Sequence, residues 1–397
     1  MEIISEDARI PREKLMDYSQ GGIKTRLKWL SRLRKVNFRH LTRFSISPET
    51  TRGNIENLIG CIQVPLGLAG PLKIDGEYAK GTFYVPLATS EGALVHACSA
   101  GMKLLTQCGG VKAKVLRDFI HVSPAFLIKG IEEAEELKEY VNTHFPEIKA
   151  AAESTTHYGK LLSIDFTMVG EAAILTFYYF TADAAGQNMI CKATDKACKF
   201  IAENTKFKDF FIRSNFSSDK KVSSFNYIRG YGKEVLAEAV IPKEIFLEKN
   251  LKTTPEDVYK LHRIAKTASF FADMKGMNAQ VANIVTAIFI ACGQDPASVV
   301  NSSLGVTSGY LLPNGDIYMS LAIFNLVVGT VGGGTGLGTQ RECLEMLDCY
   351  GPGKAKKFAE IIAASALAGE IAITISIANG TFIEGHERLG RNPPNLK

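Results

Sequence analysis

The stretch KAKKFAEIIAASALAGEIAITISIA, residues 354–378, decides the fold. It is apolar on most sides of a helix, so it predicts one long helix that is buried all round. Gly380 follows its end, where glycine commonly terminates a helix. Within this stretch, the longest apolar run is 361–377, and because Glu370 and several Ser and Thr residues interrupt that run, we expect it to be too short and too polar to span a membrane. The prediction is a large domain packed around this helix.

The other segments are predicted to surround this helix. Residues 1–52 are polar and basic, and we expect a small helical segment whose basic face is either a solvated surface or a lid for a phosphate-bearing ligand. Residues 124–211 show a helix, two strands and a helix, typical of an inserted α+β domain of ferredoxin-like type. We therefore predict an α+β fold. The large domain is expected at 53–123 and 225–397, the second part ending in a C-terminal flap, with a connecting loop at 212–224.

Apolar periodicity also predicts the individual elements. Thr89 and Ser90 are typical capping residues, so Glu91 is expected to open a helix. Strands are expected at 80–87, 160–169 and 173–181, and helices at 91–106, 132–142, 188–204, 255–271 and 279–292.

The composition is that of an ordinary globular protein. Hydrophobic residues make up 46% and charged residues 22%, and the net charge of +5 is too small to indicate nucleic-acid binding. The eight cysteines form no CxxC pair and lie near no histidine at metal-ligand spacing, so we expect reduced core thiols and no metal. The first residues lack the layout of a signal peptide. We therefore expect a cytoplasmic protein with no membrane contact.

Four isolated polar sites are candidates for chemistry. Each has an ordinary structural interpretation: a first-turn helix acid, a charged surface turn, a turn residue before proline, and a surface histidine. Together they would supply acid–base groups and an ammonium that stabilises an oxyanion. Spacing along the sequence does not bring them together. The sites are Glu91, the turn Asp219-Lys220-Lys221, Asp295 and His386.

Two further segments are candidates for binding an anion. The glycine-rich loop at 329–336 would let backbone amides approach a ligand, although its spacing is neither that of a Rossmann fold nor that of a P-loop. Residues 183–188 follow a predicted strand and precede a predicted helix, which is the geometry that holds a phosphate at a helix N-terminus.

Taken together, these segments resemble the 3-hydroxy-3-methylglutaryl-CoA reductases. The resemblance covers nearly the whole chain from about residue 8, with the motifs in family order. The N-terminal layout and the late histidine are more similar to the eukaryote-type class, without its membrane anchor. The motifs are ENLIG at 56–60, PLGLAGPL at 65–72, ATSEG at 88–92, DKK at 219–221, ANIVTAIFIACGQD at 282–295, GTVGGGT at 329–335 and the histidine at 386.

The resemblance implies an NADPH-dependent, four-electron reduction of 3-hydroxy-3-methylglutaryl-CoA to mevalonate and CoA. Lys220 would stabilise the oxyanion, and one such donor is typically worth about 3–4 kcal/mol. His386 would protonate the departing thiolate, and Glu91 would protonate the later alkoxide. Asp295 would bond to Lys220 and, as a nearby negative charge, would favour the protonated form of Glu91.

The resemblance also implies binding residues and partners. Lys192 would face a 2′-phosphate, which favours NADPH, while NADH stays open. Family members are homodimers with a shared active site, so we expect a dimer and leave a tetramer open. Substrate contacts are expected from Asp219, Lys221, Asn283, Arg213 and Arg263; cofactor contacts from Asp183, Ala184, Gly186, Gln187, Asn188, Lys192, Gly333 and Gly334; and CoA contacts from Glu56, Asn57 and Gly60.

Three positions depart from the eukaryote-type pattern. Val122 stands where the family has an arginine, Arg213 replaces a serine, and Gln280 replaces a histidine. Since losing one partner of a buried ion pair costs roughly 3–5 kcal/mol, either Arg213 replaces the missing guanidinium or the acyl group lacks the carboxylate. We hypothesise an altered acyl pocket. Two alternatives stay open: a reductase of a related acyl-CoA or carrier-protein thioester, and a non-catalytic CoA- or nucleotide-binding relative.

Overall fold

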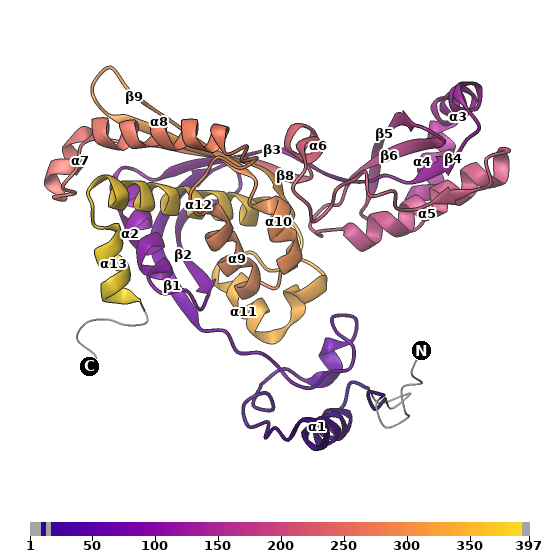
Figure 1. Cartoon of the computed structure of the whole chain (residues 1–397), viewed down its shortest axis with the longest axis horizontal. Helices are drawn as coiled ribbons and strands as arrows, with labels where there is room; N and C mark the ends of the chain where they lie inside the picture. The colour runs from indigo at the N-terminus through magenta and orange to yellow at the C-terminus, as the bar shows by residue number, and fades with distance from the viewer. Residues whose placement is uncertain (1–8, 13–16, 391–397) are drawn as a thin grey trace.

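The central helix predicted from the sequence is the core element of the protein. The computed structural model describes residues 9–12 and 17–390, so residues 1–8 and 13–16 of the predicted N-terminal segment and residues 391–397 of the predicted flap lie outside the described residues. Helix α12 (Ala355–Ala378) crosses the larger body of the molecule (Figure 1). Every side chain from Phe358 to Ile371 is buried, which confirms the prediction of a buried helix.

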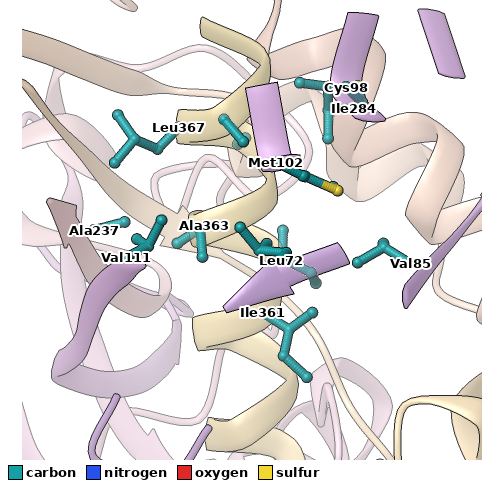
Figure 2. Packing of buried hydrophobic residues seen from close by; sticks show 14 of the residues in the cluster. Leu72, Val85, Cys98, Met102, Val111, Ala237, Ile284, Ile361, Ala363 and Leu367 are labelled. Carbon is teal, nitrogen blue, oxygen red and sulfur yellow. The ribbon is translucent and has the colours of Figure 1, made fainter. Parts of the chain in front are cut away.

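Helix α12 packs against elements from both halves of the sequence. Figure 2 shows Ala363 and Leu367 of the helix beside Leu72, Val111 and Ala237, which come from three different strands. Helices α2 (Leu94–Gln107) and α9 (Val281–Ala291) also contact α12. The apolar core therefore forms only when segments distant in the sequence meet around this helix.

Helix α12 is also long and apolar enough to cross a membrane by length and composition. The expectation that this stretch is too short and too polar to do so was therefore wrong. About two thirds of its most apolar window (67%) is buried inside the protein, which is typical of a core helix.

One mainly antiparallel sheet extends through the molecule. Its main path runs in the order β7 (Phe210–Phe211), β4 (Ala125–Leu127), β6, β3, β8, β10 (Ile317–Leu326) and β9 (Gly305–Leu311), while β1 (Leu66–Gly76), β2 (Lys80–Ala88) and β5 (Lys160–Val169) pair beside this path. Strand β3 (Val111–Val122) is shared along its length. Its residues 112–119 pair with β8 (Gly232–Ile241), and its residues 120–122 pair with β6 (Ala172–Phe180). Strand β3 thus carries the chain from the core around α12 into a second apolar core.

The second core belongs to the segment predicted as an inserted α+β unit. Helices α3 (Ile131–Thr143) and α5 (Gln187–Asn204) share this core with strands β5 (Lys160–Val169) and β6, and Figure 1 shows α5 running alongside the strands. These four elements confirm the predicted ones to within one residue at each end. Helix α4 (Phe145–Glu153), which begins with Pro146 in its first turn, was not predicted.

The remaining elements complete the large body and a small N-terminal unit, whose core is Ile23, Leu27 and Leu58. The predicted helix at 255–271 is confirmed as α8. The elements are α1 (Gln20–Arg34), η2 (Pro48–Thr51), β1 (Leu66–Gly76), β2 (Lys80–Ala88), β4 (Ala125–Leu127), β7 (Phe210–Phe211), α6 (Ser224–Arg229), α7 (Lys243–Glu248), α8 (Pro255–Phe271), η3 (Pro296–Ser298), α10 (Val299–Ser302), β9 (Gly305–Leu311), β10 (Ile317–Leu326), η4 (Gly333–Gly336), α11 (Gly338–Met346) and α13 (Phe382–Leu389).

Candidate active site

The Lys220 ammonium lies against the Asp295 carboxylate. Lys220 Nζ is 2.6 Å from Asp295 Oδ2, and nearly two fifths of each side chain is exposed. Lys220 belongs to the loop between β7 and α6 and has a left-handed backbone, with φ of 56°. Asp295 follows α9, and its Oδ1 accepts the N–H of Ala297 at 3.0 Å. Asp295 is therefore both a turn residue and the partner of the lysine.

Glu91 is held by an amide from another helix. Asn283, in the first turn of α9, donates from Nδ2 to Oε1 and Oε2 of Glu91 at 3.0 and 2.9 Å. The expectation that Glu91 opens a helix was wrong, because α2 begins only at Leu94. Ala93 has a φ of 70°, which a right-handed helix does not allow, so Gly92 and Ala93 form a turn before Leu94 and Glu91 lies ahead of that turn. That turn points the Glu91 carboxylate toward α9.

His386 faces the same space as Glu91 and Asn283. It lies on α13, and its ring stacks edge-on against Phe382 at 4.7 Å between centroids. A cavity of about 630 Å³ lies between α2, α9, α12 and α13, and Glu91, Asn283 and His386 all line it. The Gln280 side chain, which replaces the family histidine, lines it too. A carboxyl, an amide and an imidazole thus border one cavity that is large enough for a small acyl group and part of a longer chain.

The four catalytic candidates form two separate groups within one chain. Glu91 and His386 line the cavity, whereas Lys220 and Asp295 do not. Asn283 lies in the first turn of α9, and Asp295 lies beyond its last turn. The helix from Asn283 to its last residue is about 12 Å long, so the two residues are at opposite ends of α9. The expectation that Asp295 is a near neighbour of Glu91 is therefore not met within a single chain.

Arg213 is paired with the aspartate of the Asp-Lys-Lys turn. Its guanidinium forms an ion pair with Asp219, whose side chain is only 12% exposed. Ser214 donates its backbone N–H to the Ser123 carbonyl at 3.1 Å, so Arg213 lies beside the end of β3. The side chain of Val122, at that end, is buried in the second core. The guanidinium absent from position 122 is thus present nearby, on an adjacent segment.

His121, which the sequence analysis passed over, lies close to the same turn. Its side chain is fully buried, and within the described part of the chain neither ring nitrogen makes a well-formed hydrogen bond, the Gly230 backbone being the one polar group that acts on the ring as a weak partner. The rings of Tyr178, Phe225 and Tyr231 surround it at centroid distances of 5.2, 5.4 and 4.9 Å. Burial lowers the pKa of His121 to about 4, although the Gly230 backbone and, to a smaller extent, the Asp219 charge act to raise it. His121 directly precedes Val122, which stands where the family has an arginine. That adjacency was the signal in the sequence that could have pointed to His121.

The two segments predicted to bind the cofactor lie side by side. The Asp183 carbonyl accepts the Thr330 N–H at 2.8 Å. The Asp183 carboxylate accepts N–H groups of Gly353 and Ala355 at 2.7 and 3.0 Å, so it caps the start of α12. A Cβ at Gly329 would overlap the backbone at Ala185, so this contact requires glycine. Asp183 therefore joins the turn at 183–188 to the glycine-rich loop.

The surroundings of this contact suit an anionic nucleotide. Gly186 precedes the first residue of α5 with a φ of 82°, which leaves the first amides of that helix facing outward. Lys192, slightly more than one turn into α5, is exposed. Gly333 and Gly334 form η4 in the adjacent loop. The residues present therefore fit a phosphate-bearing cofactor.

Other predicted binding residues lie away from the cavity. Asn57 and Gly60 belong to the N-terminal unit, where Asn57 Oδ1 accepts Arg12 Nε at 2.9 Å. Arg263 is exposed on α8 and lies over the Tyr259 ring. None of these residues lines the cavity, and neither does Glu56. Within the described part of the chain, no group of three or more His, Cys, Asp or Glu residues could hold a metal ion.

The site offers a paired ammonium, a carboxyl and an imidazole, beside a segment that suits a phosphate-bearing cofactor, and these are the kinds of group that a nucleotide-dependent oxidoreductase uses. The family model for hydroxymethylglutaryl-coenzyme A reductase matches residues 22–391. The chain belongs to the hydroxymethylglutaryl-coenzyme A reductase family.

Individual relatives agree with this family. The chain is 43% identical over 382 residues to the 3-hydroxy-3-methylglutaryl-coenzyme A reductase of Methanocaldococcus jannaschii, covering 94% of each chain. It is 42% identical to the enzyme of Pyrococcus abyssi, covering 92% of each. The fold is similar to that of the class II enzyme of Streptococcus pneumoniae bound to NADPH, with a TM-score of 0.68, 17% identity, and 88% and 92% of the two chains covered. These archaeal and class II matches do not support the expected eukaryote-type class.

Proposed function

We propose that the protein catalyses the NADPH-dependent, four-electron reduction of 3-hydroxy-3-methylglutaryl-CoA to mevalonate and CoA. The observation that carries this proposal is the Lys220–Asp295 ion pair at 2.6 Å, found in a chain whose Glu91 and His386 line one cavity. The relatives at 43 and 42% identity carry the name of the same activity.

The roles follow from the charges that the reaction creates. Reduction of the thioester carbonyl builds an oxyanion, which the Lys220 ammonium stabilises, and Asp295 keeps that ammonium in place. The C–S bond then breaks, and His386 donates a proton to the departing thiolate sulfur. The second reduction converts the aldehyde into an alkoxide, and Glu91 donates a proton to its oxygen.

NADPH, when bound, supplies one hydride for each of the two reductions. The turn at Asp183–Asn188 and the adjacent glycine-rich loop would hold its phosphates, because backbone amides at the start of α5 and glycine backbone are available there. Lys192 would face a 2′-phosphate. The NADPH-bound structure of the Streptococcus pneumoniae enzyme supports this choice of cofactor, and NADH stays an alternative.

The active site is proposed to be shared between two copies of the chain. Helix α9 separates the Glu91–Asn283 group from the Lys220–Asp295 pair by more than the size of the reacting group. A second copy would bring Lys220 and Asp295 to the cavity of the first. Exposed apolar side chains on the β1–β2 hairpin support such an association: Leu66, Leu68 and Tyr84 are at least half exposed.

Arg213 is proposed to bind the free carboxylate of the substrate. It is paired with Asp219 beside the end of β3, where the family arginine is absent. This arrangement favours the hypothesis that Arg213 replaces the missing arginine in an altered acyl pocket. It argues against the alternative that the acyl group of the substrate lacks a free carboxylate. Lys221 is proposed to assist, since its Nζ already lies 3.3 Å from the Asp219 carbonyl.

Several finer assignments stay proposals. These are the domain limits at 52, 123, 211 and 224, CoA contacts from Glu56, Asn57 and Gly60, substrate contact by Arg263, and a cytoplasmic location. The eukaryote-type class is kept only on the strength of the N-terminal layout and the late position of the histidine.

Oxidation of NADPH against a small panel of thioesters tests the main proposal. Two NADPH should be consumed for each 3-hydroxy-3-methylglutaryl-CoA, and Lys220→Ala should lower kcat roughly 10²–10³-fold. Lys199→Ala is the matched control, because Lys199 also forms a 2.6 Å ion pair, with Asp195, but on the outer face of α5. If only other thioesters are reduced, the protein is a reductase of a related acyl-CoA or carrier-protein thioester. If NADPH or the thioester binds and nothing is reduced, the protein is a non-catalytic CoA- or nucleotide-binding relative.

A further inference from the structure

The central helix carries two buried carboxylates that the proposed reaction does not use. Glu360 is fully buried and Glu370 is 2% exposed, and both lie on α12. A buried carboxylate is costly unless hydrogen bonds satisfy its oxygens. Each of these two accepts bonds from backbone amides of a different segment. Their positions therefore indicate which segments α12 holds in place.

Glu370 holds the start of α9. Its Oε2 accepts the Ala279 N–H at 2.8 Å, and its Oε1 accepts the Gln280 N–H at 2.6 Å. These amides precede the first residue of α9, and the side chain of Gln280 makes no capping bond of its own to the helix. A carboxylate at a helix N-terminus is favoured by both the free N–H groups and the helix dipole. Glu370 thus caps α9 from a second helix.

The residue before Glu370 strengthens this contact. The Gly369 carbonyl accepts Gln280 Nε2 at 2.5 Å, so the same segment is held a second time. A Cβ at Gly369 would overlap the Ile284 Cδ1 methyl group, so the absence of a side chain here leaves room for Ile284 of α9 against α12. The first turn of α9 is therefore fixed against α12 by two hydrogen-bonded contacts and close packing.

Asn283 lies within that fixed turn and donates to both oxygens of Glu91. We propose that Glu370 is a positioning residue for catalysis, which fixes the first turn of α9 so that Asn283 holds the proton-donating carboxyl of Glu91 toward the cavity. The inference rests on the proposed function of Glu91. Glu370 does not line the cavity, so it acts through Asn283 and not on the substrate.

Glu360 offers a matched control on the same helix. It accepts N–H groups of Glu77, Tyr78 and Ala79 at 3.2, 2.9 and 2.7 Å, which lie in the turn between β1 and β2. It lies ten residues from Glu370, or about 15 Å along α12. Its bonds reach no residue assigned to the active site. Loss of Glu360 should therefore affect stability without a specific effect on catalysis.

The experiment compares Glu370→Gln with Glu360→Gln. In each variant the glutamine side chain replaces one acceptor oxygen by an NH₂ group, so at least one backbone N–H loses its acceptor. Both substitutions should therefore lower the Tm. Because a misplacement of about 1 Å can cost 10²-fold in rate, Glu370→Gln should lower kcat roughly 10–100-fold, while Glu360→Gln stays within about twofold. Equal kcat values for the two variants would overturn the inference. If Glu370→Gln does not fold, Glu370→Asp, which keeps both acceptors on a shorter side chain, replaces it.

A double-mutant cycle with Asn283→Ala separates positioning from general damage. If Glu370 acts through Asn283, its substitution should lower kcat less than about threefold once Asn283 is absent. Additive losses would mean that Glu370 does not act through Asn283. The wild-type protein measures the proposed function independently: failure of the wild type to reduce the thioester would reject that function, whereas an active wild type with additive losses rejects only the inference.

Discussion

Lys220 and Asp295 form a 2.6 Å ion pair that lies beyond the far end of α9 from the Glu91–Asn283 contact. Each pair is complete within one chain, yet the proposed chemistry needs the ammonium and the proton donors around one carbonyl. A helix cannot shorten to bring its ends together, so a second copy of the chain is the simplest way to unite them.

Complementation between two inactive variants tests this sharing. In a mixed dimer of Lys220→Ala and Glu91→Ala chains, one site combines Glu91 of the first with Lys220 of the second, and the other site carries both defects. Random mixing of equal amounts should therefore restore about one quarter of wild-type kcat. The measurement is NADPH oxidation after joint refolding. Each variant refolded alone is the control, and a mixture no more active than its parts would show that each site lies within one chain.

The sequence predicts those parts of the fold whose pattern is local. The helix at 354–378 is apolar on nearly all sides, and such a helix is stable only in a protein core or in a membrane. The strand at 160–169 alternates apolar and polar residues from Ile164 to Met168, and the one at 173–181 is a short, almost continuously apolar run rich in aromatic residues, a pattern consistent with a buried strand. These elements appear in the structure at the predicted positions.

The geometry of the site depends on contacts that no local pattern records. A left-handed Ala93 is uncommon, so nothing in the sequence suggests that Glu91 precedes the helix. The separation of Asp295 from Glu91 follows from the direction of α9 in the fold. The pairing of Arg213 with Asp219 depends on the loop lying beside the end of β3. Motifs identify these residues, and tertiary packing determines which of them meet.

Replacing Arg213 tests its role in binding the substrate carboxylate. Because the side chain is 44% exposed, water screens its charge, so Arg213→Ala should raise KM roughly 10–100-fold and leave kcat within about threefold. Arg117→Ala is a close control: Arg117 is also 44% exposed and pairs with Glu234, which is 13% exposed, on the adjacent part of β3. Steady-state kinetics with 3-hydroxy-3-methylglutaryl-CoA measures both. An unchanged KM in Arg213→Ala would reject the hypothesis that Arg213 replaces the missing arginine in binding the substrate carboxylate.

His121 should make the stability of the protein depend on pH. Burial holds its pKa at about 4 in the folded protein, below the ordinary value of about 6.5 for histidine, so the native state favours the neutral ring. The stabilisation is complete above pH 6.5 and is lost progressively as the pH falls toward 4, by up to about 3 kcal/mol. His121→Phe, which suits the surrounding aromatic rings, should flatten this part of the curve. Urea unfolding between pH 7 and pH 4 measures it.

The exposed His157 provides the control for this measurement. His157→Phe should leave the slope of unfolding free energy against pH as in the wild type. A slope that persists in His121→Phe would assign the pH dependence to other groups, such as the neighbouring Asp219.

Lys192 should set the preference for the phosphorylated cofactor. If its ammonium faces the 2′-phosphate, Lys192→Ala removes one charge-assisted contact and should raise KM for NADPH about tenfold, while KM for NADH stays unchanged. Lys196→Ala is the matched control, since Lys196 is exposed about one turn further along α5. Rates with each cofactor at saturating thioester give both constants. A parallel rise for NADPH and NADH would place Lys192 away from the 2′-phosphate, and a rise in Lys196→Ala alone would assign the contact to the later turn.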